Sequence, residues 1–192
     1  MDKILIINNG EAEITEFTKP LASIVEYSGL KAITTEYKDS FNCDLYDYIG
    51  IIMSGSPQGD DIVEHHLPYF EWVKDCKKPI FGICAGHHIT GYLFGSELLR
   101  SQEPESGDFN VRILKSDPIF NGLHNEFKVK QMHNDSITVP PDFELIATSD
   151  TCVNQLMKHK KKPLYTSQFH PEYYNSEILE NFLVICKNQK EY

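Results

Sequence analysis

Basic residues and long apolar runs are both scarce in this chain. Of its 192 residues, 18 are Lys or Arg and 28 are Asp or Glu, which gives a formal net charge of −10 at pH 7. Because an acidic chain repels phosphate backbones, we expect no nucleic-acid partner. No apolar run approaches the roughly 20 residues that span a bilayer, and the apolar stretch near the N-terminus is too short for a signal peptide. We therefore expect a cytoplasmic protein with no membrane partner.

Sequence patterns for disulfides, metals and nucleotides are also missing. The five cysteines are widely spaced and odd in number, so they do not form a disulfide framework. Two adjacent histidine pairs occur, His65-His66 and His87-His88, but adjacent side chains of a helix point apart. Neither His-Glu-x-x-His nor Cys-x-x-Cys occurs, and no glycine-rich nucleotide motif is found. We expect no metal and no cofactor.

The first half of the chain alternates between strand and helix patterns. Short apolar runs are typical of buried parallel strands. They lie at Lys3–Ile7, Lys31–Tyr37, Tyr48–Ser54 and Pro79–Ile83. Helical spacing predicts one helix that contains Leu21 and Val25, with Thr18 as its cap, and a second helix over Ile62–Asp75. This alternation predicts an α/β fold with a parallel sheet.

The second half has short strand candidates with little helix between them. They lie at Phe109–Leu114, Glu126–Met132, Glu144–Ser149, Cys152–Met157 and Leu164–Phe169. These segments predict an antiparallel extension of the sheet, and a final helix is expected over Ser176–Lys187. Domains usually have roughly 100–200 residues. We therefore predict one domain over residues 1–192, with an open, mostly parallel sheet flanked by helices and a small antiparallel extension.

The segment Gly82-Ile83-Cys84-Ala85-Gly86 directly follows a predicted buried strand. A nucleophile on a sharp strand-to-helix turn needs small residues two positions before and after it, and glycine stands at both. The helix that starts near Gly86 would direct its N-terminal dipole at the sulfur and lower the pKa of the thiol. This pattern indicates that Cys84 is a nucleophile. The alternative is a buried cysteine that merely closes a strand.

A second cluster, Gln168-Phe169-His170-Pro171-Glu172, follows another predicted strand. A cysteine nucleophile needs a base, and the base needs a group that fixes its tautomer. His170 can be the base and Glu172 the orienting carboxylate, because a rigid turn across Pro171 lets their side chains meet. Since ligands bind beyond the carboxyl ends of parallel strands, both clusters are expected at one edge of the sheet.

These motifs together resemble the class I (triad) glutamine amidotransferases, whose fold is flavodoxin-like. The resemblance rests on the Cys84 and His170 segments and on Ser54-Gly55-Ser56-Pro57, which is similar to the family's Ser-Gly-Gly-Pro oxyanion loop. It covers almost the whole chain. The stretch Met132-His133-Asn134-Asp135 is also similar to the Ser-His-Gly-Asp segment in the glutaminase part of GMP synthetase.

The resemblance implies hydrolysis of the glutamine side-chain amide. Cys84 would form a γ-glutamyl thioester, with His170 and Glu172 completing the catalytic set. Gly55 and Ala85 would supply N–H groups to the oxyanion, and a separate synthase subunit would use the released ammonia. Substrate contacts are expected from four residues, Ser56, His88, His133 and Asn134.

Three positions depart from the family pattern. His88 replaces a glutamine that helps to hold the substrate, Ser56 replaces the second glycine of the oxyanion loop, and Asn134 replaces the glycine of the substrate-side segment. Two alternatives therefore stay open. One is a γ-glutamyl hydrolase that acts on other γ-glutamyl compounds, and the other is a regulatory homologue with weak or no catalysis.

Overall fold

The computed structural model describes residues 1–58, 62–100 and 104–189. Its strands are β1 (Lys3–Asn8), β2 (Lys31–Glu36), β3 (Gly50–Met53), β4 (Ile80–Ile83), β5 (Leu98–Leu99), β6 (Glu105–Ile113), β7 (Glu126–His133), β8 (Ser136–Ile137), β9 (Phe143–Thr148), β10 (Leu156–His159) and β11 (Leu164–Ser167). Its α-helices are α1 (Thr18–Tyr27), α2 (Ile62–His66), α3 (Ala85–Leu93), α4 (Pro171–Tyr174) and α5 (Ser176–Gln189).

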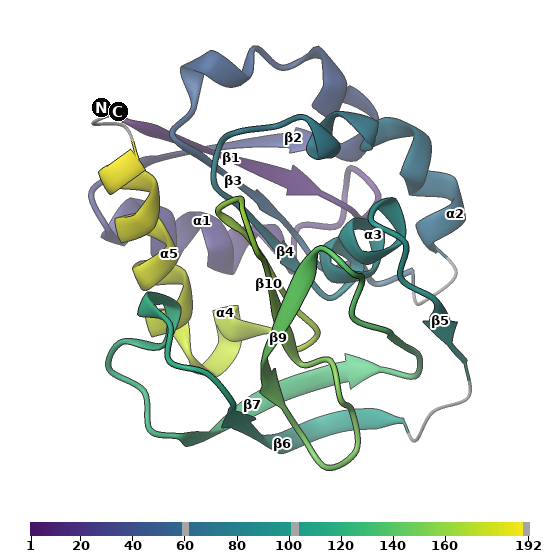
Figure 1. The fold of residues 1–192 in the computed structure, drawn as a ribbon. Helices are drawn as coiled ribbons and strands as arrows, with labels where there is room; N and C mark the ends of the chain where they lie inside the picture. The colour runs from purple at the N-terminus through teal and green to yellow at the C-terminus, as the bar shows by residue number, and fades with distance from the viewer. Residues whose placement is uncertain (59–61, 101–103, 190–192) are drawn as a thin grey trace.

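Nine strands form one sheet in the order β2-β1-β3-β4-β11-β10-β9-β6-β7 (Figure 1). The first five are mutually parallel, and every pairing from β11 to β7 is antiparallel. β5 and β8 form a separate two-stranded sheet. The predicted α/β fold with a parallel sheet and an antiparallel extension is confirmed. The extension supplies four strands of the main sheet, β10, β9, β6 and β7.

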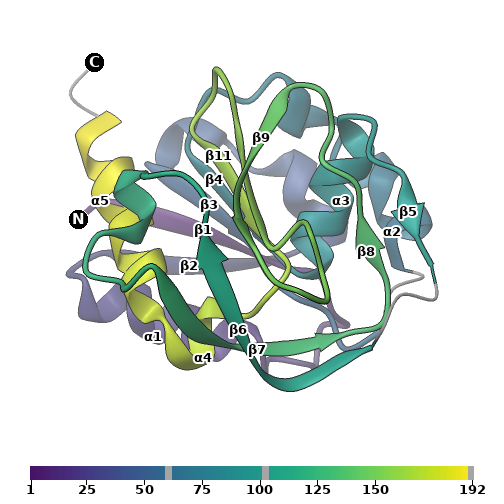
Figure 2. The same ribbon diagram turned by 60° about the horizontal axis from the view of Figure 1, so that its bottom comes forward.

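Helices cover both faces of the parallel strands (Figure 2). On one face α1 and α5 pack against alternate residues of the strands, including Ile4 and Ile6. On the other face α3 packs against the intervening residues, including Leu5 and Ile7. Because successive side chains of a strand point to opposite faces, a strand buried on both sides is apolar at nearly every position. This burial explains the unbroken apolar runs in the sequence.

Two predicted helix details are wrong. The helix expected over Ile62–Asp75 ends at His66 and continues as two 3₁₀ turns, Leu67–Tyr69 and Glu71–Lys74. Pro68 lies in the first of these turns, and proline cannot donate the hydrogen bond that would extend an α-helix. Thr18 is not a cap but the first residue of α1, whose N-cap residue is Phe17.

Strand boundaries also differ from the prediction, and β6, expected over Phe109–Leu114, already begins at Glu105. The strand expected over Cys152–Met157 begins only at Leu156 and continues to His159. The segment before it is held by side-chain hydrogen bonds instead, because the Ser149 hydroxyl accepts from the N–H of Cys152 at 3.0 Å and from Gln155 Nε2 at 3.0 Å. Among the described helices, none has the length and apolar character that crossing a membrane requires.

Candidate active site

Cys84 lies at the turn between β4 and α3. Its backbone has φ 48° and ψ −96°, and it is the only residue other than glycine with a positive φ in the described chain. Such a conformation costs of order 1–3 kcal/mol and persists only where its surroundings enforce it. Here the N–H of Cys84 donates to the Ser167 carbonyl at 2.8 Å, and its own carbonyl accepts from His88 N–H at 3.0 Å. These bonds hold the turn that the sequence predicts.

The two glycines around Cys84 are required by close packing of the backbone. A Cβ on Gly82 would lie 2.6 Å from the carbonyl oxygen of Gly86. A Cβ on Gly86 would lie 2.7 Å from the carbonyl oxygen of Met53, at the end of β3. Both obstacles are backbone atoms, which cannot move aside like a flexible side chain. The first turn of α3 therefore packs directly onto two strand ends.

His170 and Glu172 meet in the way that the motif predicts. His170 follows β11 and precedes α4, and its Nδ1 lies 2.8 Å from Glu172 Oε1. Burial lowers the pKa of His170, but the charges of Glu172 and Cys84 outweigh this effect and raise the pKa to about 10. These two charges favour the protonated imidazole beside the cysteine. An imidazolium next to a cysteine favours the thiolate, which is the nucleophilic form.

The His170 ring is enclosed by its neighbours. Phe17 stacks on it with ring centroids 5.1 Å apart, and the Tyr173 ring lies 5.9 Å away. On a third side, a Cβ on Gly55 would lie only 2.6 Å from His170 Cε1. The side chain of His170 is 1% exposed. Its position is therefore set by packing as well as by the bond to Glu172.

The loop after β3 is tied to the end of β1. The Ser54 hydroxyl accepts a hydrogen bond from the N–H of Asn9 at 3.0 Å, and Asn9 Nδ2 donates to the Ser54 carbonyl at 2.7 Å. This anchoring holds Gly55 against the ring of His170. Within the described residues, neither the N–H of Gly55 nor that of Ala85 donates a backbone hydrogen bond. Gly55 and Ala85 stay predictions as donors to the oxyanion.

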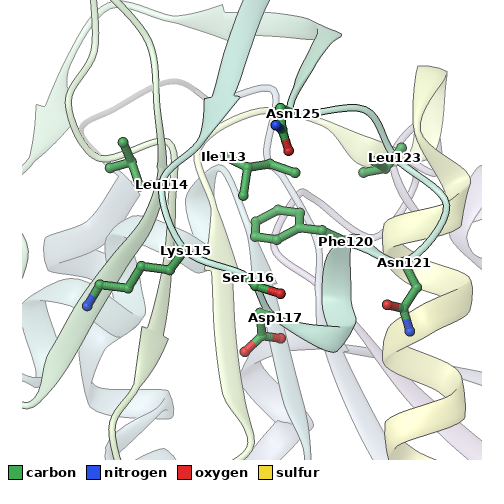
Figure 3. A pocket seen from close by; sticks show the side chains of 9 residues that line it. All are labelled: Ile113, Leu114, Lys115, Ser116, Asp117, Phe120, Asn121, Leu123 and Asn125. Atoms are coloured by element: carbon green, nitrogen blue, oxygen red, sulfur yellow. The ribbon is translucent and has the colours of Figure 1, made fainter.

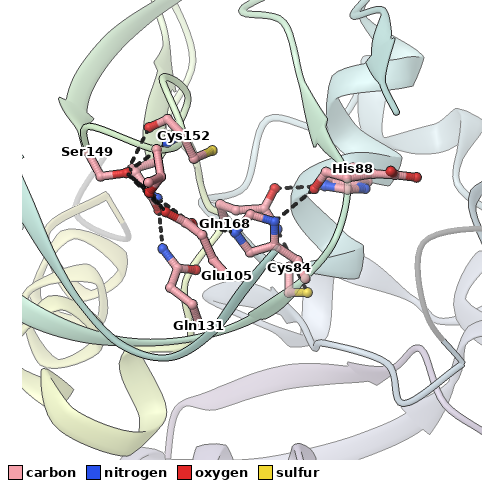
Figure 4. A network of polar contacts seen from close by, with 11 residues as sticks. Cys84, His88, Glu105, Gln131, Ser149, Cys152 and Gln168 are labelled. Atoms are coloured by element: carbon pink, nitrogen blue, oxygen red, sulfur yellow. Dashed lines mark hydrogen bonds and ion pairs between the residues drawn. The ribbon is translucent and has the colours of Figure 1, made fainter. Parts of the chain in front are cut away.

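The residues predicted to contact substrate lie in different surroundings. Ser56 is half-buried in the loop after β3, and Asn134 is exposed after β7. His88 is 2% exposed on α3, and its Nε2 lies 2.7 Å from Gln168 Oε1 (Figure 4). Gln168 in turn approaches Cys84, so the structure connects His88 to the Cys84 sulfur through a second side chain.

His133 lies in a buried polar cluster. Its Nδ1 contacts the Asp135 carbonyl at 2.8 Å, and its Nε2 lies 2.7 Å from Glu105 Oε2. Burial raises the pKa of Glu105, but hydrogen bonds from His133 and others outweigh it and lower that pKa. Glu105 also accepts from three further side chains, Ser149, Thr151 and Gln155. Glu105 belongs to no sequence motif and lies 28 residues from His133, so the sequence alone does not predict that the two side chains meet.

Glu105, His133 and Cys152 are also the kind of group that can bind a metal, with ligand atoms within 4.8 Å of one another. Glu105 and His133 are already bonded to each other. With no metal bound, burial and the charge of Glu105 raise the pKa of the Cys152 thiol to about 12.

The predicted catalytic residues are nearly closed to solvent. The relative exposure of Cys84 and Glu172 is 8% each. A pocket of about 400 Å³ lies elsewhere, between the end of β6 and the start of β7 (Figure 3). It is lined by Ile113, Leu114, Lys115, Ser116, Asp117, Phe120, Asn121, Leu123 and Asn125. None of these residues belongs to the predicted site.

Comparison with known proteins gives a consistent result. The family model of glutamine amidotransferase class-I matches residues 5–186. A glutamine-hydrolysing GMP synthase subunit from Methanocaldococcus jannaschii is 33% identical over 188 residues, which are 95% of this chain and 97% of the relative. The corresponding subunit from Thermoplasma acidophilum is 36% identical over 159 residues, 80% of this chain and 78% of the relative.

Solved structures agree with the sequence relatives. A T. acidophilum protein described as a GMP synthase subunit has a TM-score of 0.90 at 31% identity, covering 100% of this chain and 96% of that one. A Thermotoga maritima glutamine amidotransferase has a TM-score of 0.75 at 18% identity, covering 99% of this chain and 84% of that one, and shows the shared fold. The family match extends over the strand ends that carry Cys84, His170 and Glu172. The chain belongs to the class-I glutamine amidotransferase family.

Proposed function

We propose that this chain hydrolyses the side-chain amide of glutamine and supplies ammonia to a separate synthase subunit. The observation that carries the proposal is Cys84 at its strained turn, beside a His170 that is bonded to Glu172 at 2.8 Å. The relatives are named as glutamine-hydrolysing subunits, which favours this function over the γ-glutamyl hydrolase and regulatory alternatives.

The reaction follows from the charges in the site. The Cys84 thiolate attacks the carboxamide carbon, and the carbonyl electrons move onto oxygen, which accepts from the N–H groups of Gly55 and Ala85. When the tetrahedral intermediate collapses, the C–N bond breaks and the His170 imidazolium gives its proton to the leaving nitrogen. This step releases ammonia and leaves a γ-glutamyl thioester on Cys84.

Water completes the cycle. His170, now neutral, removes a proton from a water molecule that attacks the thioester, and the thiolate leaves as glutamate forms. Glu172 keeps the tautomer of His170 and stabilises its positive form. Ser56, His88, His133 and Asn134 stay predictions as substrate contacts.

Labelling with a diazo-ketone analogue of glutamine tests the nucleophile. We expect mass spectrometry to find one adduct, on Cys84, and ammonia release to stop in proportion to labelling. Cys152→Ser is a matched control, since the Cys152 thiol is buried and its pKa is raised to about 12 by burial and by Glu105. Adducts on Cys43 or Cys76 with Cys84 unlabelled would contradict the proposal.

Parallel turnover assays test the substrate and the partner. Glutamine should be hydrolysed faster than γ-glutamyl amides such as glutathione. Because the catalytic residues are almost fully buried, we expect slow hydrolysis by the isolated chain and faster hydrolysis once a synthase subunit opens and orders the site. A high rate on γ-glutamyl amides without any partner would support the alternative hydrolase instead.

A further inference from the structure

Gln168 lies between His88 and Cys84 and is fully buried (Figure 4). Its Oε1 lies 2.7 Å from His88 Nε2, and its Nε2 lies 4.0 Å from Cys84 Sγ. An amide oxygen can only accept a hydrogen bond, so His88 Nε2 must carry the proton and donate it. This bond leaves the NH₂ end of the amide facing the sulfur.

We infer that the Gln168 amide stabilises the Cys84 thiolate as a catalytic hydrogen-bond donor, and that His88 is the positioning residue that holds the amide in this orientation. The inference rests on the proposed role of Cys84 as the nucleophile. It assigns His88 to the chemistry of the sulfur, whereas the family pattern predicts a role for position 88 in holding the substrate.

The orientation of the amide matters because its two ends have opposite polarity. A donor aimed at a thiolate favours the charged form, and a carbonyl oxygen in its place would oppose it. The backbone of Gln168 is fixed, since its N–H donates to the Gln155 carbonyl at 2.9 Å. The remaining freedom is rotation of the amide, which the bond from His88 prevents.

Other titratable groups lie near the contacts that link His88, Gln168 and Cys84. His170 and Glu172 face Cys84 from the β11–α4 turn. His87 lies next to His88, and burial, followed by the charges of His88 and His133, keeps its pKa well below the ordinary value. Because His87 is neutral, it adds no positive charge that could replace the donor from Gln168.

A neighbouring hydrogen bond offers a matched control. His87 Nδ1 contacts Thr166 Oγ1 at 2.7 Å, so it joins α3 to β11, whereas the neighbouring bond from His88 reaches Gln168 just beyond the end of that strand. The bond between His87 and Thr166 does not lead to Cys84. Thr166→Val removes it with almost no change of shape, and we expect it to leave the reactivity of the sulfur unchanged.

The test measures alkylation of Cys84 by iodoacetamide as a function of pH in the whole chain, with mass spectrometry to identify the residue. His88→Leu and Gln168→Met should each raise the pH midpoint of the reaction by about half to one unit, because each removes a hydrogen bond to the charged form. The double variant should shift no further than either single one, since both act through one contact. His88→Gln should restore the midpoint, because its amide can still donate.

The result can be separated from the proposed function. Alkylation requires no glutamine turnover, so the expected shifts would support the inference even if the chain failed to release ammonia from glutamine. A midpoint that is unchanged in Gln168→Met, or that shifts equally in Thr166→Val, would overturn it. So would a His88→Leu variant that changes only the KM for glutamine, because that result assigns His88 to the substrate.

Discussion

Gly55→Ala should disable the enzyme without removing any chemical group from the site. The added Cβ would lie 2.6 Å from His170 Cε1, whereas ordinary contact begins at 3.4 Å, so the ring must retreat by about 0.8 Å. Phe17 stacks on the same ring, and the added Cβ would itself be 3.5 Å from Phe17 Cδ1. The retreat therefore strains the 2.8 Å bond to Glu172. Misplacement of a reacting group by about 1 Å costs about 10²-fold in rate.

The assay is ammonia release from glutamine under single-substrate conditions. We expect kcat to fall by about 10²-fold with a smaller change in KM, because alanine keeps the N–H that is proposed to bind the oxyanion. Urea denaturation should show a loss of about 1–3 kcal/mol in the free energy of unfolding, as for other overpacked sites. Gly10→Ala is the comparison variant, since its Cβ would lie 3.3 Å from Asn8 Oδ1 and from Pro57 Cδ, only about 0.1 Å inside ordinary contact. A Gly55→Ala variant with normal kcat would refute the reasoning.

Three further predictions concern charge and packing. Burial lowers the pKa of His170, but the charges of Glu172 and Cys84 raise it to about 10. The alkaline limb of the pH profile of kcat/KM should therefore lie near that pH and move toward neutrality in Glu172→Gln. An alkaline limb that does not move in this variant would contradict the role of the Glu172 charge in raising the pKa. Burial keeps the pKa of His87 well below its ordinary value, so His87 protonates only in the unfolded chain below about pH 6.5. As the pH is lowered below about 6.5, the free energy of unfolding should therefore decrease by up to roughly 1.4 kcal/mol per pH unit. Urea titrations at several pH values should show that the free energy of unfolding depends less on pH in His87→Gln than in the native chain. Gly86→Ala should lower the free energy of unfolding by about 1–3 kcal/mol, measured the same way, because a Cβ would meet the Met53 carbonyl oxygen at 2.7 Å; an unchanged stability would show that the strand end can move aside.

The fold class follows from the sequence because burial on two faces makes a distinctive pattern. Parallel strands covered by helices on both sides must be apolar at almost every position, and β1, β3 and β4 are. The helix ends were less predictable. Pro68 ends α2 early, although the apolar residues beyond it keep the spacing of a helix.

The sequence also determined the pairing of His170 with Glu172 and the turn at Cys84. Both depend on residues close together in the chain: a proline between base and carboxylate, and glycines two positions on either side of the sulfur. Local stereochemistry limits what such short segments can do, so their geometry follows from the residue types.

Contacts between distant segments were decided only by the tertiary structure. His88 and Gln168 are 80 residues apart, and Glu105 and His133 are 28 apart, and no spacing rule links either pair. Gln168 stands two residues before His170, yet the neighbouring sequence does not show that its side-chain amide points toward Cys84 or that His88 holds the amide in that orientation. A side chain's partners depend on which strands lie side by side in the sheet, and here β4 and β11 bring the two halves of the site together.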